Sequence, residues 1–400
     1  MKIAVAGQNY HIKGGSDKVL MDEQNLLRSY GHEVAPFCGS DPKNEDTRWE
    51  EFFPRRDVSL SSPRLQDVCR YVYNNDAKKA VRRFISAFRP DIFHCHIYYG
   101  KLSASILGEI KDSGIPLVQT IHEYKTVCPT YQLISNEQVC EKCSGFAYYN
   151  VLFNRCNRNS VLRSAVSMVE SYASYFLGSI SKIDRFIAVS NFQRQKVVEM
   201  GVPKDKVVTI YNFIDADSCS PTYETGRYFL YFGRIEKTKG IWSLIRAFEK
   251  LKTITLLVVG TGNEYSAVTS YCELQQITNV KFFGFANRAQ LNDLIKGAVA
   301  TIVPSVWYET FGLSAAESLA HGKPVIAADI GGLPEVLSPG EDSILFEPGN
   351  VDQLSLAVVD LAMNKQRAVD MGMAGRRNVK AKFNKAKHYE ELVAVYQSLT

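Results

Sequence analysis

Two glutamates with seven residues between them are the chemically most informative feature of this chain. Glu309 and Glu317 lie in one stretch with Trp307 before them. Residues 313–320 are rich in Ala and Leu and predict the first turns of a helix, and residues 308–312 predict the loop before it. One carboxylate therefore precedes a helix N-terminus, and the other lies about one turn inside the helix. Because N–H groups at a helix N-terminus bind phosphate oxygens, the arrangement suits a ligand that joins a phosphate to hydroxyl-rich groups, such as a nucleotide sugar.

Two cations follow an apolar run in the second half of the chain. Arg234 and Lys239 come directly after the run 229–232, and Gly233 between them and the run allows a tight backbone turn. Either these cations neutralise a bound diphosphate, or they form a solvated basic loop.

Length and composition exclude several classes of protein. The chain has 400 residues, which exceeds one usual core and favours two domains. It is 46% hydrophobic and 22% charged, with a net charge of +5 and a pI of about 8.6. This mild basicity does not predict a nucleic-acid partner, although it is compatible with an anionic substrate or an anionic membrane surface.

No apolar run reaches the roughly 20 residues that a membrane span requires. The first residues, 1–7, are too short for a signal peptide and predict a buried strand. We therefore expect a cytoplasmic protein. In that compartment the nine cysteines favour free thiols or a metal over disulfides.

Short apolar runs alternate with amphipathic helical stretches along the chain, which predicts parallel sheets of the doubly wound α/β kind. The predicted strands are 3–6, 92–95, 117–121, 186–189, 229–232, 255–259, 280–283, 300–303 and 324–327. They form two sets, so we predict two Rossmann-like domains, residues 1–216 and 217–385, with a hinge near 215–223. Ligands of parallel sheets lie outside the carboxyl ends of the strands, so we expect the two domains to face each other across a ligand-binding cleft. Residues 123–180 interrupt the alternation as a cysteine-containing insertion.

The chain resembles retaining glycosyltransferase family 4, which has the GT-B fold and a signature of two glutamates with seven residues between them. The resemblance covers nearly the whole chain in the expected order. It rests on Glu309 with Glu317 and on Gly14-Gly15, 120–123, 188–191, 211–215, 232–240, 259–262 and 331–335. The family also implies that the last helix, 386–400, returns to the first domain.

The resemblance implies roles for the donor-binding residues. Glu309 would contact hydroxyls of the donor sugar, and Glu317 would bind the ribose hydroxyls. Backbone N–H groups of Phe311, Gly312 and Leu313 would face the diphosphate or the sugar. Arg234 and Lys239 would neutralise the diphosphate and stabilise the charge that grows as the glycosidic bond breaks.

Glycine loops are implied to approach the nucleotide. Gly14 and Gly15 are either a plain turn or, as in the family, a loop whose N–H groups reach the distal phosphate. They lack the spacing of the dinucleotide fingerprint. The loop that contains Gly260 and Gly262 would border the nucleoside, together with Phe285.

Three histidines lie at the ends of apolar runs. His122 is either a buried, satisfied side chain or, as the family implies, a contact to hydroxyls of the donor sugar. His94 and His96, with Tyr98 and Tyr99, either line the acceptor pocket or are structural.

Four cysteines of the insertion have a spacing typical of a structural zinc site. Cys128, Cys140, Cys143 and Cys156 include a Cys-x2-Cys core, and four thiolates complete a zinc tetrahedron. The alternative is four unligated thiols. The resemblance implies that catalysis itself requires no cofactor, and we interpret Asp215-Ala216-Asp217 as a linker rather than a metal site.

Residues 160–181 form an amphipathic stretch with Arg155, Arg158 and Arg163 near its start. Such a segment either lies on a membrane surface or packs its apolar face on the protein. We favour packing, and we keep a peripheral contact at the inner face of the membrane as the alternative.

Together these features predict a retaining glycosyltransferase of polysaccharide biosynthesis. It would move a hexose, glucose or a relative, from a nucleoside diphosphate, by family frequency a UDP-sugar, to a hydroxyl of a glycan or a lipid-linked acceptor. Two other classes remain open. One is another GT-B nucleotide-sugar enzyme such as an epimerase, and the other is a non-catalytic protein that binds sugar nucleotides. Donor turnover with and without an acceptor distinguishes the three.

Overall fold

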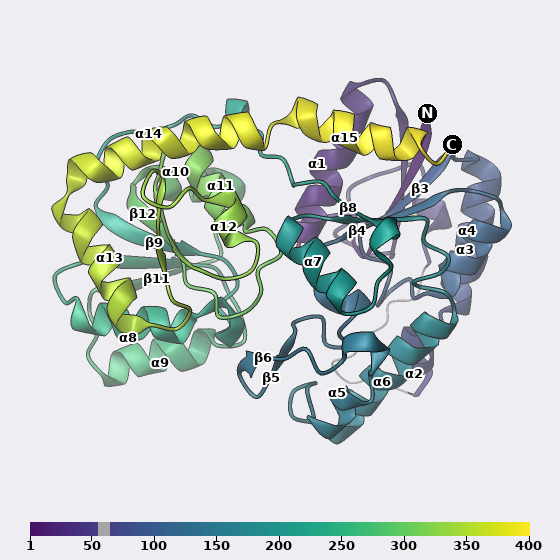
Figure 1. Ribbon diagram of the computed structural model, residues 1–400, viewed down its shortest axis with the longest axis horizontal. Helices are drawn as coiled ribbons and strands as arrows, with labels where there is room; N and C mark the ends of the chain where they lie inside the picture. The colour runs from purple at the N-terminus through teal and green to yellow at the C-terminus, as the bar shows by residue number, and fades with distance from the viewer. Residues whose placement is uncertain (55–64) are drawn as a thin grey trace. The chain divides into compact units, whose positions relative to one another are not determined.

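The computed structural model describes residues 1–54 and 65–400 (Figure 1). By its contacts the chain divides into two compact units. Unit 1 contains Met1–Tyr211 and Ala386–Thr400, and unit 2 contains Asn212–Lys385. The boundary lies a few residues before the division at 216 and 217 that the sequence suggested.

Unit 1 holds, within the described residues, a six-stranded parallel sheet of order β2-β1-β3-β4-β7-β8. The strand order reverses between β1 and β3, where a doubly wound sheet has its ligand-binding crevice. The strands are β1 (Lys2–Gly7), β2 (Glu33–Cys38), β3 (Ile92–Cys95), β4 (Leu117–Ile121), β7 (Arg185–Ala188) and β8 (Val207–Thr209). A small antiparallel pair, β5 (Ile134–Ser135) and β6 (Gln138–Val139), belongs to the insertion.

The helices of unit 1 cover its sheet because the strands bury apolar residues on both faces. One cluster joins Ile3 and Val5 of β1 to Leu27 of α1 and to Leu392 and Tyr396 of α15, so the last helix is part of this core. The helices are α1 (Gly15–Ser29), α2 (Leu65–Val72), α3 (Asn75–Phe88), α4 (Ser105–Asp112), α5 (Asn150–Phe153), α6 (Val161–Phe176), α7 (Asn191–Glu199) and α15 (Lys385–Gln397).

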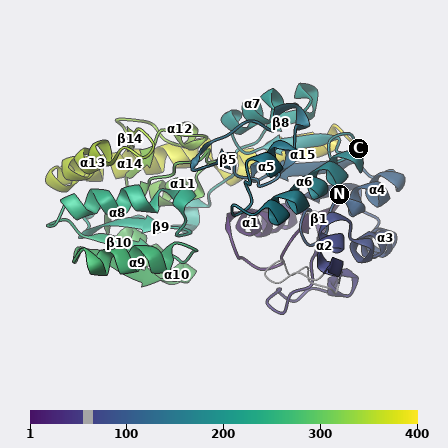
Figure 2. The ribbon, with the colours of Figure 1, turned by 90° about the horizontal axis from the view of Figure 1, so that it is seen from below.

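Unit 2 holds, again within the described residues, a six-stranded parallel sheet of order β11-β10-β9-β12-β13-β14 (Figure 2). Its strand order reverses between β9 and β12, the position of the nucleotide crevice in a Rossmann fold. The strands are β9 (Tyr228–Phe232), β10 (Leu256–Val259), β11 (Val280–Gly284), β12 (Ala298–Val303), β13 (Val325–Ala328) and β14 (Ser343–Phe346).

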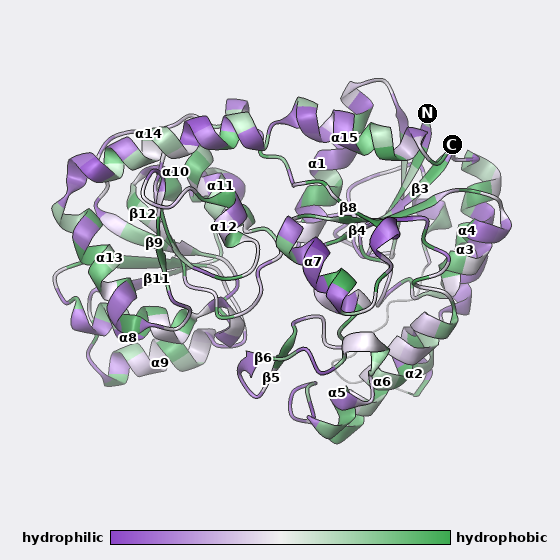
Figure 3. Ribbon diagram, in the orientation of Figure 1, coloured by the Kyte–Doolittle hydropathy of each residue, from purple (hydrophilic) through white to green (hydrophobic). Residues whose placement is uncertain are grey.

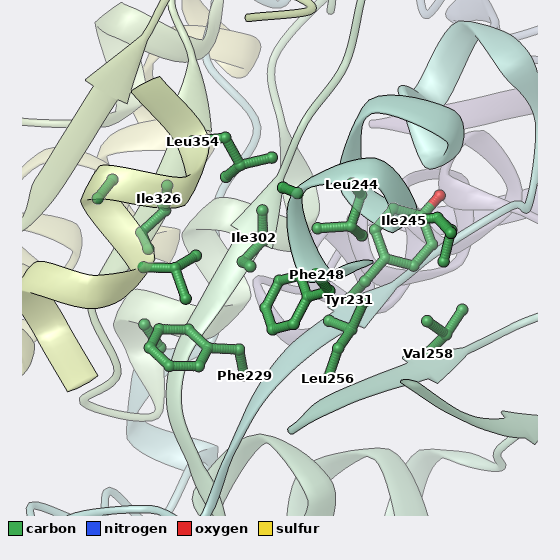
Figure 4. Packing of buried hydrophobic residues seen from close by; sticks show 14 of the residues in the cluster. Phe229, Tyr231, Leu244, Ile245, Phe248, Leu256, Val258, Ile302, Ile326 and Leu354 are labelled. Carbon is green, nitrogen blue, oxygen red and sulfur yellow. The ribbon is translucent and has the colours of Figure 1, made fainter. Parts of the chain in front are cut away.

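Alternate residues of these strands face two separate cores. Phe229 and Tyr231 pack with Leu244 and Phe248 of α8 (Figure 4), whereas Leu230 packs with Ile295 of α10 on the other face. The sheet is therefore covered on both sides, as a parallel sheet requires. The helices are α8 (Ile241–Lys250), α9 (Tyr265–Leu274), α10 (Arg288–Lys296), α11 (Leu313–Ala320), α12 (Leu333–Val336), α13 (Val351–Met363) and α14 (Lys365–Lys382).

Among the described residues, no helix is both long enough and apolar enough to cross a membrane.

Candidate active site

The loops that follow β9 and β12 meet at the point where the strand order of unit 2 reverses. Lys239 of the first loop donates from Nζ to Glu309 Oε1 of the second at 2.7 Å. The Val306 N–H also donates to the Thr238 carbonyl oxygen at 3.0 Å. The structure thus brings together a cation and a carboxylate that are 70 residues apart in the chain.

Glycines allow these loops to approach closely. Gly240 has φ +72°, and a Cβ there would collide with the carbonyl oxygen of Pro304. Gly331 has φ +66°, and a Cβ there would run into the backbone of Glu309. The Gly332 N–H donates to the Glu309 carbonyl oxygen at 2.7 Å. The backbone of Glu309 is therefore held by the glycine pair that follows β13, which gives the 331–335 motif a structural role.

The Glu309 carboxylate is buried and ionised. Its residue is 7% exposed, and Oε1 also accepts a hydrogen bond from the Ser305 hydroxyl. Burial is the largest single influence and opposes ionisation, but the Lys239 ammonium together with hydrogen bonds from Ser305 and Trp307 outweighs it and holds the pKa of Glu309 below its usual value. Lys239 also lies 4.9 Å from the centre of the Trp307 ring. Both charges are thus fixed in position before any ligand arrives.

The N-terminus of α11 lies just beyond this pair. Gly312 precedes the helix with φ +102°, and a Cβ there would lie 2.5 Å from Leu333 Cδ2. Phe311 is 1% exposed and packs edge-on against Phe383 with ring centres 5.3 Å apart. The Phe311 side chain is therefore an anchor, and only backbone groups of Phe311, Gly312 and Leu313 are available as ligands. The first N–H groups of a helix have no acceptor within it, so this is a region suited to phosphate.

Glu317 is the fifth residue of α11 and has a different partner from Glu309. Arg288 at the start of α10 donates from Nη1 to Glu317 Oε1 at 2.7 Å. Glu317 is 7% exposed, and the Arg288 side chain is half exposed. Arg288 was not among the residues predicted from the sequence. The only local indication of its position is that it directly follows Asn287, which caps α10.

Arg234 pairs with a carboxylate on its own loop. Its Nη1 donates to Glu236 Oε1 at 3.0 Å, and its side chain is 55% exposed. The Tyr231 hydroxyl donates to the Arg234 carbonyl oxygen at 2.6 Å. The backbone of Arg234 is therefore held while its guanidinium remains accessible to a ligand.

The loops after β10 and β11 pack beside the β9 loop. A Cβ at Gly260 would collide with the carbonyl oxygen of Gly233, and a Cβ at Gly262 would collide with that of Ile235. Both glycines are thus required for loop packing, whatever they border. Phe285 is 77% exposed, an unusual environment for such a side chain and one suited to stacking on a planar ligand.

In unit 1, Gly14 and Gly15 form the start of α1. Asp17 Oδ2 accepts hydrogen bonds from the N–H of Gly14 at 3.1 Å and from that of Lys13 at 3.3 Å. A Cβ at Gly14 would meet nothing within 4 Å. The Gly14 N–H that the sequence analysis assigned to a phosphate is thus bonded to a carboxylate here.

The histidines at the ends of β3 and β4 form a buried chain. His96 Nδ1 lies 2.9 Å from His122 Nε2, and the two rings stack at 5.1 Å. Glu23 Oε1 of α1 lies 3.0 Å from His94 Nδ1 and 3.2 Å from His96 Nε2. His94 and His96 are at most 1% exposed, so they are core residues and do not line a pocket.

Electrostatics within this chain stabilise an ionised glutamate beside a neutral histidine. Burial opposes ionisation of Glu23, yet His94 and His96 hold the pKa of Glu23 well below its usual value. Burial, with the neighbouring His96, lowers the pKa of His122 well below its usual value. His122 is therefore neutral at pH 7 and can exchange hydrogen bonds with hydroxyls.

Of the residues that the structure describes, one group places three ligand atoms within 4.8 Å of one another, namely Glu23, His94 and His96. Two histidines and a carboxylate suit zinc by type. However, the same atoms face one another in a buried cluster of a carboxylate and imidazole rings, which His388 completes at 3.2 Å from Glu23 Oε2. Glu23 was not among the predicted site residues either. The feature that could have indicated it is an acidic residue on the apolar face of α1.

The four cysteines of the insertion are free thiols near one another. Cys128 and Cys143 are buried, and Cys140 and Cys156 are partly exposed. Burial, followed by the charges of the three neighbouring thiols, raises the pKa of Cys143 to about 12. Within the described chain these thiols do not reach the 4.8 Å spacing of a formed metal site.

The acidic pair near the domain boundary has other partners. Asp215 pairs with Lys385 at 3.0 Å, and Asp217 pairs with Lys380 at 2.6 Å. The two carboxylates are thus held apart by different lysines of the same unit.

Comparison with solved structures assigns the fold of these two units. The chain superposes on sucrose-phosphate synthase from Thermosynechococcus elongatus with a TM-score of 0.76 and 19% identity, covering 100% of this chain and 98% of that one. It superposes on Anabaena HepE in complex with UDP-glucose with a TM-score of 0.74 and 17% identity, covering 100% of both chains. Two six-stranded, Rossmann-like units that match these structures over the whole chain form the GT-B fold.

Family comparison then identifies the particular group. The model described as Glycosyltransferase Family 4 matches residues 13–218, and the model described as Glycosyl transferases group 1 matches residues 216–378. The chain belongs to glycosyltransferase family 4, as the sequence analysis predicted. An uncharacterised glycosyltransferase of Methanocaldococcus jannaschii is 26% identical over 376 residues, 88% of this chain and 84% of that protein. Glycogen synthase of Mycobacterium tuberculosis is 26% identical over 308 residues, 74% of this chain and 66% of that protein.

Proposed function

We propose that this glycosyltransferase is a retaining enzyme that transfers a hexose, glucose or a close relative, from a UDP-sugar to a hydroxyl of a glycan or lipid-linked acceptor in polysaccharide biosynthesis. The observation that carries the proposal is the ion pair between the partly buried Lys239 and the buried Glu309, beside the N-terminus of α11. A nucleotide sugar consists of a diphosphate with a sugar on one side and a ribose on the other. The cation and the helix terminus suit the diphosphate, and the two carboxylates suit the hydroxyls on either side of it. The similarity to HepE, whose structure holds UDP-glucose, supports a UDP-glucose-like donor.

Each donor group has a proposed partner in unit 2. Glu317 binds the ribose hydroxyls, and Glu309 orients the sugar hydroxyls. Lys239, Arg234 and the backbone N–H groups at the start of α11 compensate the diphosphate charge. Arg234 can fork two phosphate oxygens, whereas Lys239 acts as a point charge.

Further residues keep their expected roles as proposals. Phe285 stacks on the base, beside the loop that holds Gly260 and Gly262. In unit 1, His122 bonds sugar hydroxyls, and Gly14 and Gly15 offer backbone N–H groups to phosphate. For Gly14 this requires the ligand to replace the bond to Asp17.

The proposed mechanism is front-face substitution. Glu309 is engaged by Lys239 and Ser305, and Glu317 is engaged by Arg288, so neither is placed as an evident nucleophile. Retaining hydrolases instead hold two carboxyls about 5 Å apart across the bond. The bond from the anomeric carbon to the phosphate oxygen breaks, and the acceptor oxygen bonds to the carbon on the same face. The acceptor proton passes to an oxygen of the leaving phosphate.

The experiment that tests this function is donor turnover with labelled UDP-glucose, with and without an acceptor extract. We expect labelled glycan or lipid to appear only with the acceptor, and an α-linked product from an α-linked donor. Isomerised UDP-sugar without acceptor would instead indicate an epimerase, and donor binding without turnover in any extract would indicate a binding protein.

We expect catalysis to be independent of an added divalent metal, because Lys239, Arg234 and the α11 terminus supply the charge compensation for phosphate. Activity should survive dialysis against EDTA and should change less than about twofold when Mg²⁺ or Mn²⁺ is added. Loss of activity with EDTA and recovery with either ion would contradict this. Because zinc in unit 1 would confuse the EDTA arm, the response to Mg²⁺ or Mn²⁺ decides.

We also propose that Cys128, Cys140, Cys143 and Cys156 bind one structural zinc, which would draw together thiols that already influence one another. The surrounding segment has little regular structure, so a metal would supply stability that its own core cannot. All nine cysteines are free, which supports a reducing, cytoplasmic location.

The zinc proposal makes Cys140→Ser a local destabiliser. This variant should lose bound zinc and become more sensitive to protease between residues 129 and 158. The control is Cys69→Ser, which changes an exposed thiol outside the group. Elemental analysis of reduced, untagged protein is the direct measurement. Less than about a tenth of an equivalent of zinc or iron, with all four thiols reactive in the native protein, would leave them as unligated cysteines.

A further inference from the structure

Helix α6 turns polar residues inward and part of its apolar face outward. Its four buried residues are all polar, namely Ser164, Ser167, Glu170 and Ser171. By contrast, four of its large apolar residues are half exposed or more, with Val161 at 51%, Leu162 at 75%, Val169 at 50% and Phe176 at 79%. The expected packing of the apolar face on the protein is present at Tyr172 and Tyr175, which contact Tyr148 and Phe146, but these four side chains remain outside it. A helix at the surface of a globular protein normally has the opposite orientation.

Specific partners hold this orientation. Glu170 forms a buried ion pair with Lys125, whose Nζ also donates to the Ser171 hydroxyl at 3.1 Å. Asn157 Nδ2 donates to the Ser167 hydroxyl at 2.8 Å. Rotating α6 to bury its apolar side would leave Lys125 as an unpaired buried charge, which is costly. The outward apolar face is thus a consequence of satisfied polar contacts beneath it.

The exposed apolar surface continues onto α5. Tyr149, which precedes α5, and Phe153, its last residue, are 50% and 77% exposed, and Tyr175 of α6 is 36% exposed. Helices α5 and α6 lie side by side in both views, and Figure 3 shows hydrophobic residues along them. Seven of the twenty exposed large apolar side chains among the described residues fall between residues 149 and 176. Such concentration in so short a segment marks a contact surface rather than scattered exposure.

The exposed charges of the segment that forms this α5–α6 surface have one sign. Residues 142–182 contain a single acid, Glu170, which is buried against Lys125. The cations of the same segment are Lys142, Arg155, Arg158, Arg163 and Lys182. Arg155 and Arg158 are exposed and directly precede α6. The surface is therefore apolar with a cationic edge.

We propose that the α5–α6 surface docks on an anionic lipid bilayer. Leu162, Phe153 and Phe176 enter the interfacial layer, and Arg155 and Arg158 bind lipid phosphates at its edge. Charge complementarity selects this partner over a second copy of the chain, because two copies meeting through this surface would bring cationic edges together. The inference deepens the proposed function and rests on its lipid-linked form of the acceptor, which would be held in such a bilayer.

The test is co-sedimentation of the full chain with vesicles, in the absence of donor. Wild type should bind phosphatidylglycerol–phosphatidylcholine vesicles and bind pure phosphatidylcholine vesicles much less. The double variant Phe153→Ser with Phe176→Ser should weaken vesicle binding at least about tenfold, because two rings that would insert into the bilayer are lost. Arg155→Gln with Arg158→Gln should weaken it on the order of tenfold and reduce its salt dependence.

The matched control changes exposed apolar residues elsewhere. Leu356 and Met363 of α13 are 69% and 78% exposed, and Leu356→Ser with Met363→Ser should bind vesicles as wild type does. Equal loss in this control, or no binding of wild type to anionic vesicles, would overturn the proposal. A dimer in sedimentation velocity that the Phe153 and Phe176 changes abolish, without vesicle binding, would assign the surface to a second copy.

Turnover with a water-soluble acceptor separates this inference from the proposed function. The surface variants should keep wild-type turnover there, while losing it on acceptor embedded in vesicles. If the proposed function is wrong, the wild-type protein shows no turnover with either acceptor, although it still binds vesicles.

Discussion

Lys239→Ala is expected to lower turnover of the sugar donor on the order of 10²–10³-fold. Lys239 is a partly buried cation at the sheet reversal of unit 2, bonded to Glu309 Oε1 at 2.7 Å. Its removal takes a positive charge from the departing diphosphate and also removes the cation that keeps Glu309 ionised. The measurement is steady-state release of nucleoside diphosphate with saturating acceptor. The control is Lys250→Ala, which removes an exposed lysine that pairs with Asp352 in the same unit.

The pH profile of this variant gives a second readout. In wild type the pKa of Glu309 lies below its usual value, so Glu309 stays ionised at neutral and mildly acidic pH. Without Lys239, only the hydrogen bonds from Ser305 and Trp307 oppose the effect of burial, so the pKa of this carboxyl should rise. Residual activity of Lys239→Ala should then fall as pH falls, over a range where wild type is unaffected. Near-wild-type turnover of Lys239→Ala, or of Arg234→Ala, would remove the proposed role of that residue.

The strands that sequence analysis missed share a physical cause. All nine predicted strands are present with ends within two residues. The three undetected strands of the two large sheets, β2, β8 and β14, are all edge strands. Strand β2 contains Pro36, which argues against a central strand but is tolerated at an edge. Strands β8 and β14 are short and partly exposed, so they lack the continuous apolar run typical of a strand buried on both faces.

The site was predictable where it follows from topology. Lys239 and Glu309 follow strands that a doubly wound sheet makes neighbours, so their pairing could be expected from the strand pattern. Arg288 and Glu23 could not be found in this way, because each lies on a helix, and the order of the strands does not specify which helix side chains meet their partners. The same holds for α6. Its periodicity shows an apolar face, but only the Lys125–Glu170 pair, which joins residues 45 apart, decides that this face points outward.

The two glutamates of the signature should separate in a binding experiment. Glu317→Ala should weaken both UDP alone and the full donor, by about 10–100-fold, because the ribose loses charge-assisted hydrogen bonds worth about 1.5–3 kcal/mol. Arg288 loses its partner in this variant but is half exposed, so it can be solvated and the fold should persist. Calorimetry with UDP and with UDP-glucose measures both constants, and Asp352→Asn, at an exposed ion pair of unit 2, is the control.

Glu309→Gln should give the complementary result. The amide oxygen can still accept the Ser305 hydrogen bond, so the loop should keep its shape. UDP affinity should be unchanged or slightly higher, because Lys239 is released from its carboxylate and becomes fully available to phosphate. Turnover should nevertheless fall by at least about tenfold, because the sugar loses an ionised acceptor for its hydroxyls. If Glu309→Gln weakens UDP while Glu317→Ala spares it, the ribose-binding and sugar-orienting roles are reversed. If neither variant changes UDP binding or turnover, the signature carboxylates are surface residues of a loop and a helix, and the donor binds elsewhere.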